Sequence, residues 1–166
     1  MRPVLAAPPI AALAAALAAI ALRPVELVRV EDERRGRTFT FPVARGEPFT
    51  VTWQHSMYDQ PVTDEYVVGP GDEIVLRAVS SPSAAAREYL GLTAAGERQP
   101  IVRALPRVVF RVAEGAPQRL RVGGEERSFL ELGDPGDRLV LSARRVPAAA
   151  RWLARLRAPL PRPERR

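Results

Sequence analysis

Residues 49–66 read FTVTWQHSMYDQPVTDEY, and the alternation within this stretch decides the fold. Apolar and polar side chains alternate from residue 49 to residue 56, which is typical of a strand with one buried face. The face expected to turn inward carries Phe49, Val51, Trp53 and His55. His55 is the only histidine in the chain, so the pattern predicts one inward-pointing imidazole at the end of an apolar stripe.

A second strand is expected to begin at Thr63 and to return antiparallel to the first. Pairing of Ser56 with Thr63 would place His55 opposite Asp64, on the same face of the sheet. A shift of two residues would instead place His55 opposite Tyr66. The alternation alone leaves both registers open.

Outside this stretch, a period of two and frequent Val, Thr and aromatic residues mark further short strands. They are expected over residues 25–30, 38–41, 73–79, 107–112, 119–122, 126–130 and 138–142. Gly and Pro separate them, and Gly123-Gly124 is typical of a two-residue hairpin. The only internal helix is expected over residues 83–90, with Ser83 as its cap. Residues 25–142 should therefore form a mostly β domain, a small antiparallel β-sandwich or barrel.

The chain begins with an apolar segment. From Pro3 to Leu22 no residue is charged, and Arg2 precedes the run. Residues 10–22 have the length of a signal-peptide core, Ala19-Ile20-Ala21 matches a cleavage site, and the run from Pro3 is also about long enough to span a bilayer. Residues 1–22 are therefore expected to form an apolar helix, either a signal peptide cut after Ala21 or a membrane anchor. Either way, the domain would reside in the cell envelope, on the periplasmic side of the inner membrane.

The positive charge is concentrated at the end of the chain. The net charge is +6, and residues 142–166 contain eight arginines and one acid, which leaves the rest close to neutral. A basic tail on a neutral domain with few aromatic residues argues against nucleic-acid binding. The absence of cysteine excludes disulfides, thiol catalysis and cysteine-type zinc sites.

Residues 143–166 form an Arg/Pro-rich tail that is expected to be partly helical from Pro147 to about Arg157. A basic amphipathic helix containing Trp suits the surface of an anionic membrane. The residues of this candidate membrane surface are Arg151, Trp152, Leu153, Arg155 and Leu156. The alternative is a solvated, partly disordered tail.

Three interpretations of His55 remain open. It could be structural and close the end of the core, or it could belong to a ligand or partner site. It could also serve a hydrolase-like enzyme with Glu65 or Asp64 as its acid partner. Catalysis is disfavoured because neighbouring strand residues such as His55 and Ser56 project to opposite faces, and no G-x-S-x-G turn is present. No ligand spacing suggests a metal, and no cofactor is expected. The candidate ligand or partner site comprises His55, Ser56, Tyr58, Glu65 and Tyr66.

The elements His55-Ser56, Pro61-Val62 and Glu65-Tyr66 resemble the pattern of a bacterial family, domain of unknown function 1850 (DUF1850). The resemblance extends over roughly Phe49 to Ser142. Members of that family are typically small exported or membrane-anchored proteins, often encoded beside TRAP-type uptake transporters of the TAXI subclass. The resemblance implies a periplasmic accessory or binding role, with a transporter subunit as the candidate partner.

One stretch departs from that family. After the fifth strand the family tends to carry Gly-Ala-Gly, whereas this chain reads SAAAR from Ser83 to Arg87. Glycine allows left-handed backbone and the close approach of a ligand, while a run of alanine favours helix. A ligand held by that loop in the family would therefore be bound differently here, or not bound.

Overall fold

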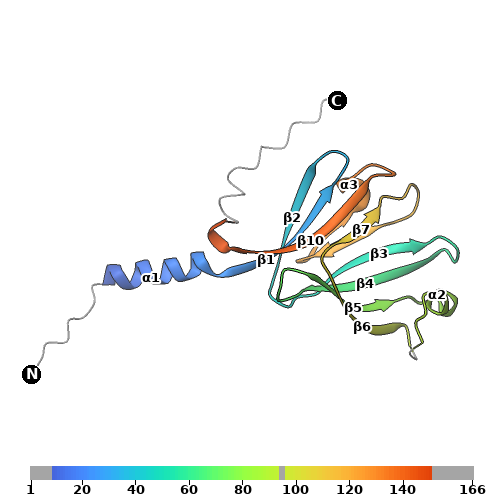
Figure 1. Ribbon diagram of the computed structural model, residues 1–166, viewed down its shortest axis with the longest axis horizontal. Helices are drawn as coiled ribbons and strands as arrows, with labels where there is room; N and C mark the ends of the chain where they lie inside the picture. Colours follow the sequence, from blue (N-terminus) through green and yellow to red (C-terminus); the bar gives the residue numbers. More distant parts are fainter. Residues whose placement is uncertain (1–8, 94–95, 151–166) are drawn as a thin grey trace, which may run out of the picture. The chain divides into compact units, whose positions relative to one another are not determined.

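The computed structural model describes residues 9–93 and 96–150. The chain is mostly β, as predicted, and forms two antiparallel sheets (Figure 1). The strands are β1 (Pro24–Asp32), β2 (Arg37–Val43), β3 (Phe49–His55), β4 (Gln60–Val68), β5 (Ile74–Ser80), β6 (Arg98–Leu105), β7 (Val108–Arg111), β8 (Arg119–Val122), β9 (Glu125–Ser128) and β10 (Arg138–Pro147). The helices are α1 (Pro9–Leu22), α2 (Ala84–Tyr89) and α3 (Phe129–Leu132). Residues 26–145 form one compact unit, and the described residues on either side of it, 9–25 and 146–150, belong to a second unit.

The two sheets share one core. The four-stranded sheet has the order β2-β1-β10-β7, and the six-stranded sheet has the order β6-β5-β4-β3-β8-β9. Apolar residues at alternate positions of both sheets are buried together, which is consistent with a β-sandwich. Prominent members of the core are Val28, Val30, Phe41, Phe49, Val51, Leu120, Leu139 and Leu141.

The β3–β4 hairpin has a tighter turn than the sequence suggested. His55 pairs with Gln60 and Trp53 with Val62, so both expected registers are wrong. Strand β4 begins before Pro61, a residue that cannot donate a ladder hydrogen bond. The proline is tolerated because β5 starts to pair with β4 only at Thr63, so no β5 ladder bond is lost at that position.

Residues 56–59 make the turn of this hairpin. The Asp59 amide donates to the His55 carbonyl at 2.8 Å, which closes the turn. Asp59 adopts a φ of 51°, in the left-handed region that Asp and Asn tolerate better than most residues. A short turn of this kind leaves His55 as the last paired residue of β3.

Several other elements differ from expectation. Strand β10 continues to Pro147 rather than ending at Ser142, and β6 was not anticipated because Pro100 and two arginines hide its pattern. Residues 129–132 form α3 instead of extending a strand, because Ser128 and Glu131 make a capping box there. Helix α2 and the Gly123-Gly124 hairpin were predicted correctly, and Ser83 caps α2.

The remaining predictions concern the ends of the chain. The described side chains of α1, residues 12–22, are mostly exposed. Within residues 9–93 and 96–150, no helix is both long and apolar enough to cross a membrane. The signal-or-anchor role of residues 1–22 stays a prediction. The candidate membrane surface, residues 151–156, lies outside the described residues.

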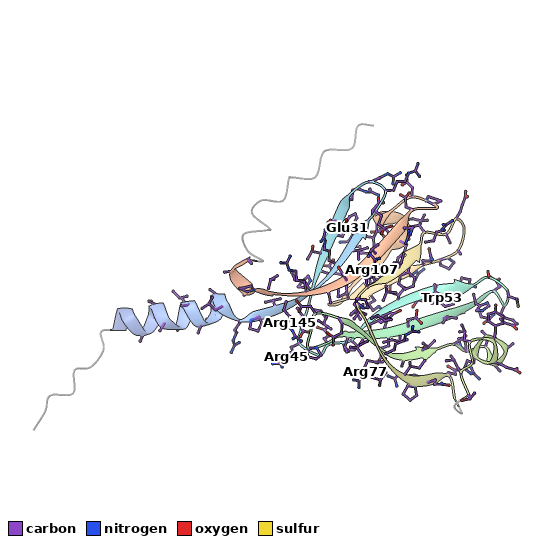
Figure 2. All side chains as sticks on the ribbon, in the orientation of Figure 1. Glu31, Arg45, Trp53, Arg77, Arg107 and Arg145 are labelled. Atoms are coloured by element: carbon purple, nitrogen blue, oxygen red, sulfur yellow. The ribbon has the colours of Figure 1, made fainter. Side chains whose placement is uncertain are left out.

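Two buried ion-pair clusters fasten distant segments of the β domain. At one of them, the Arg145 guanidinium (labelled in Figure 2) donates to Glu26 Oε1 through Nε at 3.1 Å and Nη2 at 3.0 Å. It also donates to the carbonyls of Gly69 and Pro70. Since Glu26 is buried, this bonding ties β1 and β10 to the β4–β5 turn.

The second cluster joins the β1–β2 turn to the turn before β10. Asp32 and Asp137, whose side chains are fully buried, anchor it. Asp32 accepts from the backbone amides of Arg34 and Arg35 and from the guanidinium of Arg37. Asp137 accepts from the side chains of Arg34 and Arg35. Both carboxylates are therefore satisfied despite their burial.

Candidate functional site

His55 lies at the end of β3 and points inward, as predicted, with only 5% of its surface exposed. Its Nδ1 accepts a hydrogen bond from the Met57 backbone amide at 3.3 Å. An accepting Nδ1 carries no proton, so the neutral ring holds its proton on Nε2. The turn after β3 thereby fixes both the orientation and the tautomer of the imidazole.

Three aromatic rings surround the imidazole. Trp53 on β3 (Figure 2) stacks on it at 5.9 Å, Tyr58 in the turn lies at 5.1 Å, and Tyr89 at the end of α2 meets it edge-on at 5.0 Å, each measured between ring centroids. The two tyrosine rings also contact each other at 6.0 Å. We call His55, Met57, Tyr58 and Tyr89 the hairpin tip. Its aromatic members come from three segments and form one packed group.

The hairpin tip is accessible at its outer side. Tyr89 is 60% exposed and Met57 is 65% exposed. Every fully buried side-chain nitrogen or oxygen of the described residues has a hydrogen-bond partner. His55 Nε2 has no hydrogen-bond partner among these residues. It follows that Nε2 touches solvent. An incoming group can therefore reach two large side chains, Tyr89 and Met57, beside the edge of the imidazole.

Helix α2 is held firmly against the sheet, and this positions Tyr89. The Ser83 hydroxyl accepts from the Ala86 amide at 3.2 Å, and Arg87 donates to the Ser81 carbonyl at 2.6 Å. Beyond the helix, Leu92 packs with Val62 and Val79 in a small apolar cluster. Because these contacts join α2 to the inner face of the six-stranded sheet, the Tyr89 ring does not depend on a loose loop.

Deeper along the hairpin, Asp64 accepts two hydrogen bonds on one oxygen. Trp53 Nε1 donates to its Oδ2 at 3.1 Å, and the Tyr66 hydroxyl donates to the same atom at 3.2 Å. Burial raises the pKa of the Asp64 carboxyl above its ordinary value, against the effect of both hydrogen bonds. Burial, followed by the nearby Asp64 charge, raises the pKa of Tyr66. Tyr66 therefore stays a neutral donor within the core.

The structure brings together only part of the candidate ligand or partner site. His55 and Tyr58 are in contact, while Ser56 is an exposed turn residue. Tyr66 is 3% exposed and stacks on Phe49 inside the core. Glu65 belongs to the opposite face of the sheet, where it pairs with Arg98 at 2.8 Å.

The arrangement required for an enzyme is not assembled at His55. Asp64 lies opposite Val51, four residues from His55 along β3, and its Oδ2 is occupied by Trp53 and Tyr66. Glu65 is on the other face. Across residues 9–93 and 96–150, no group of three His, Cys, Asp or Glu side chains could hold a metal ion.

Tyr89 and Met57 are the members of the hairpin tip that sequence reasoning missed, and Tyr89 is the one that is distant in sequence from His55. It follows the SAAAR stretch, and nothing local relates it to His55. The only local signal is Leu90 and Leu92 directly after a capped helix, which favours packing of that end of the helix against the rest of the domain. The position of the helix on the sheet was not encoded locally.

Comparisons of the chain with protein-family models, with curated proteins and with solved structures find no match. The resemblance of His55-Ser56, Pro61-Val62 and Glu65-Tyr66 to DUF1850 stays a prediction. The function is therefore inferred from the geometry of the β domain.

Proposed function

We propose that the β domain is a non-enzymatic binding module of the cell envelope and that the hairpin tip is its protein-binding surface. The observation that carries this proposal is the exposure of Tyr89 and Met57, at 60% and 65%, above a buried His55. Aromatic residues and Met are enriched at protein interfaces, and Tyr is frequent among the residues that dominate binding energy. Large side chains on a packed base provide such an anchor.

The hairpin tip is also arranged before any partner arrives. The Tyr89 ring is placed by a capped helix, and the imidazole by its bond to the Met57 amide. Side chains that are already ordered lose little conformational entropy on binding, so more of the contact energy appears as affinity. This supports recognition of one specific partner.

The partner proposed is a subunit of a TRAP-type uptake transporter of the TAXI subclass, in the role of an accessory protein. Two sequence features support this: the motif resemblance around His55, and the uncharged stretch from Pro3 to Leu22, which suits export or anchoring. The domain would then act on the periplasmic side of the inner membrane. A hydrolase-like activity is not favoured, because neither Asp64 nor Glu65 reaches His55.

The test is purification of the tagged full-length chain from its native membranes in mild detergent, followed by mass spectrometry of the proteins that accompany it. We expect a transporter subunit with the unmodified chain. Recovery should fall at least about tenfold with Tyr89→Ala, as expected for an interface anchor. Val102→Ala is the matched control, since Val102 is 77% exposed on β6, away from the hairpin tip.

Two outcomes would contradict the proposal. Equal recovery with Tyr89→Ala and Val102→Ala would remove the hairpin tip as the binding surface. Purification of the unmodified chain without any transporter subunit would remove the transporter as partner. Circular dichroism of each variant confirms that a loss of binding does not reflect unfolding.

A further inference from the structure

A hollow of about 520 Å³ lies on the outer face of the six-stranded sheet, turned away from the core. Its volume is within the range of roughly 300–1,000 Å³ that small-molecule sites occupy. Unlike most such sites it is lined largely by polar side chains. Those used in the argument are Thr50, Thr52, Thr63, Arg119, Arg121 and Glu126.

Threonines make the floor of the hollow. Thr50 and Thr52 project from β3 and Thr63 from β4, and all three are half-buried. The hydroxyls of Thr52 and Thr63 lie 3.0 Å apart, as cross-strand partners. Short hydroxyl side chains leave space above the sheet and present donors and acceptors to whatever fills it.

Arginines from β8 make one wall. The pairing of β3 with β8 places Arg121 beside Thr50 and Arg119 beside Thr52. Glu126 on β9 holds both guanidinium groups, with Arg121 at 2.7 Å and Arg119 at 3.2 Å. The bonds from Arg121 are the main reason that the pKa of Glu126 lies below its ordinary value, so Glu126 is charged at neutral pH.

The arginines of this wall have positive charge and hydrogen-bond donors available for an anion. Two arginines face one carboxylate, which leaves one positive charge in excess. Arg119 donates to Glu126 through Nη1 only, and elsewhere in the described chain its Nε and Nη2 have no hydrogen-bond partner. A planar guanidinium with two free donor groups matches the geometry of a carboxylate.

We propose that this hollow binds a small carboxylate ligand that also carries hydroxyl groups, such as a sugar acid or hydroxy acid. The ligand carboxylate bonds to Arg119, with Arg121 beside it. The ligand hydroxyls exchange hydrogen bonds with the threonine floor. A single negative charge matches the single excess positive charge, which favours a carboxylate over the more highly charged phosphate. The site is on the opposite face of β3 from the hairpin tip and does not depend on the proposed function.

The test is isothermal titration calorimetry of the full-length chain in mild detergent with sodium D-glucuronate. D-glucose, acetate and inorganic phosphate are the comparison ligands. Arg119→Gln should weaken glucuronate binding about tenfold or more, the usual effect of losing a charged hydrogen bond. Glu126→Gln should strengthen it severalfold, because it frees both arginines. The charge-matched controls are Arg103→Gln on β6 and Glu88→Gln on α2, both exposed.

Opposite effects of Arg119→Gln and Glu126→Gln, with both controls unchanged, would support the proposal. The absence of glucuronate binding at millimolar concentration would overturn it. Equal effects of Arg119→Gln and Arg103→Gln would also overturn it, since they would indicate only attraction by net charge. Binding of D-glucose, acetate or phosphate as tight as that of glucuronate would refute the assigned ligand class.

Discussion

Arginine and carboxylate side chains meet in two regions of the β domain that differ in burial. The carboxylates of Asp32 and Asp137 are fully buried, whereas the side chain of Glu126 on the outer face is 37% exposed. The buried carboxylates are surrounded by donors from the protein itself. On the outer face, Nε and Nη2 of Arg119 have no partner among the described residues. The same chemistry thus stabilises the fold in one region and leaves a binding capacity in the other.

The reason for this difference is the cost of desolvation. A charge removed from water must be compensated by several hydrogen bonds, and the loss of one partner leaves the others unsatisfied. An exposed pair gains little because water already solvates both charges. Replacement of a carboxylate should therefore change the free energy of unfolding most at the buried Asp32, less at the half-buried Asp64 and least at the exposed Glu126.

The largest effect is expected for Asp32→Ala. The change leaves the amides of Arg34 and Arg35 without their acceptor and should lower the free energy of unfolding by about 3–5 kcal/mol, as is usual when a buried ion pair loses one member. Urea denaturation of the full-length chain, followed by circular dichroism, measures it. Glu33→Ala, an exposed carboxylate next in sequence, is the control. Similar losses for the two variants would refute the ranking.

An intermediate, pH-dependent effect is expected for Asp64→Asn. The pKa of Asp64 is raised by burial, so its protonated form stabilises the fold and this contribution is lost as pH rises through the raised pKa. Asparagine can still accept from Trp53 and Tyr66 but does not titrate. The wild type should therefore lose stability relative to Asp64→Asn as the pH rises above about 4, the ordinary pKa of an Asp carboxyl.

Urea midpoints of both proteins at increasing pH check this prediction. Glu88→Gln, which removes an exposed carboxylate on α2, is the control for the change in net charge. A difference between wild type and Asp64→Asn that stays constant with pH would show that burial does not raise the pKa of Asp64.

The smallest effect is expected for Glu126→Gln, whose urea midpoint should match that of the wild type. Its ion pairs with Arg119 and Arg121 are exposed, and such pairs contribute little to folding. The measurement is the same denaturation experiment. A loss approaching that of Asp32→Ala would mean that Glu126 is structural, and the comparison between the two regions would fail.

Much of the fold could be predicted because its signals are local. The alternation from Phe49 to His55 depends only on the pleat of one strand, so the inward orientation of His55 followed directly. The Ser83 cap and the Gly123-Gly124 turn are likewise set by residues close in sequence. The strand expected over residues 126–130 was wrong because the alternation was given more weight than another local signal, the Ser128–Glu131 capping box that begins α3.

The candidate sites could be predicted less well. Of the four residues grouped with His55 in the candidate site, only Tyr58 places its ring against the imidazole, because the observed β3–β4 register sets Tyr66 opposite Phe49 and leaves Glu65 on the other face. Pro61 reads as a strand breaker in isolation. Its position in β4 is acceptable only because no β5 strand is bonded to it there.

The sequence by itself determined the mostly β character of the domain and the inward face of β3. Only the tertiary structure decided which residues meet: Tyr89 reaches His55 through α2, and Arg119 stands beside Thr52 through the pairing of β3 with β8. Strand orientation follows from the side-chain alternation of a single strand. Contacts between distant segments depend on the hydrogen bonding and burial of whole sheets, which no local periodicity records.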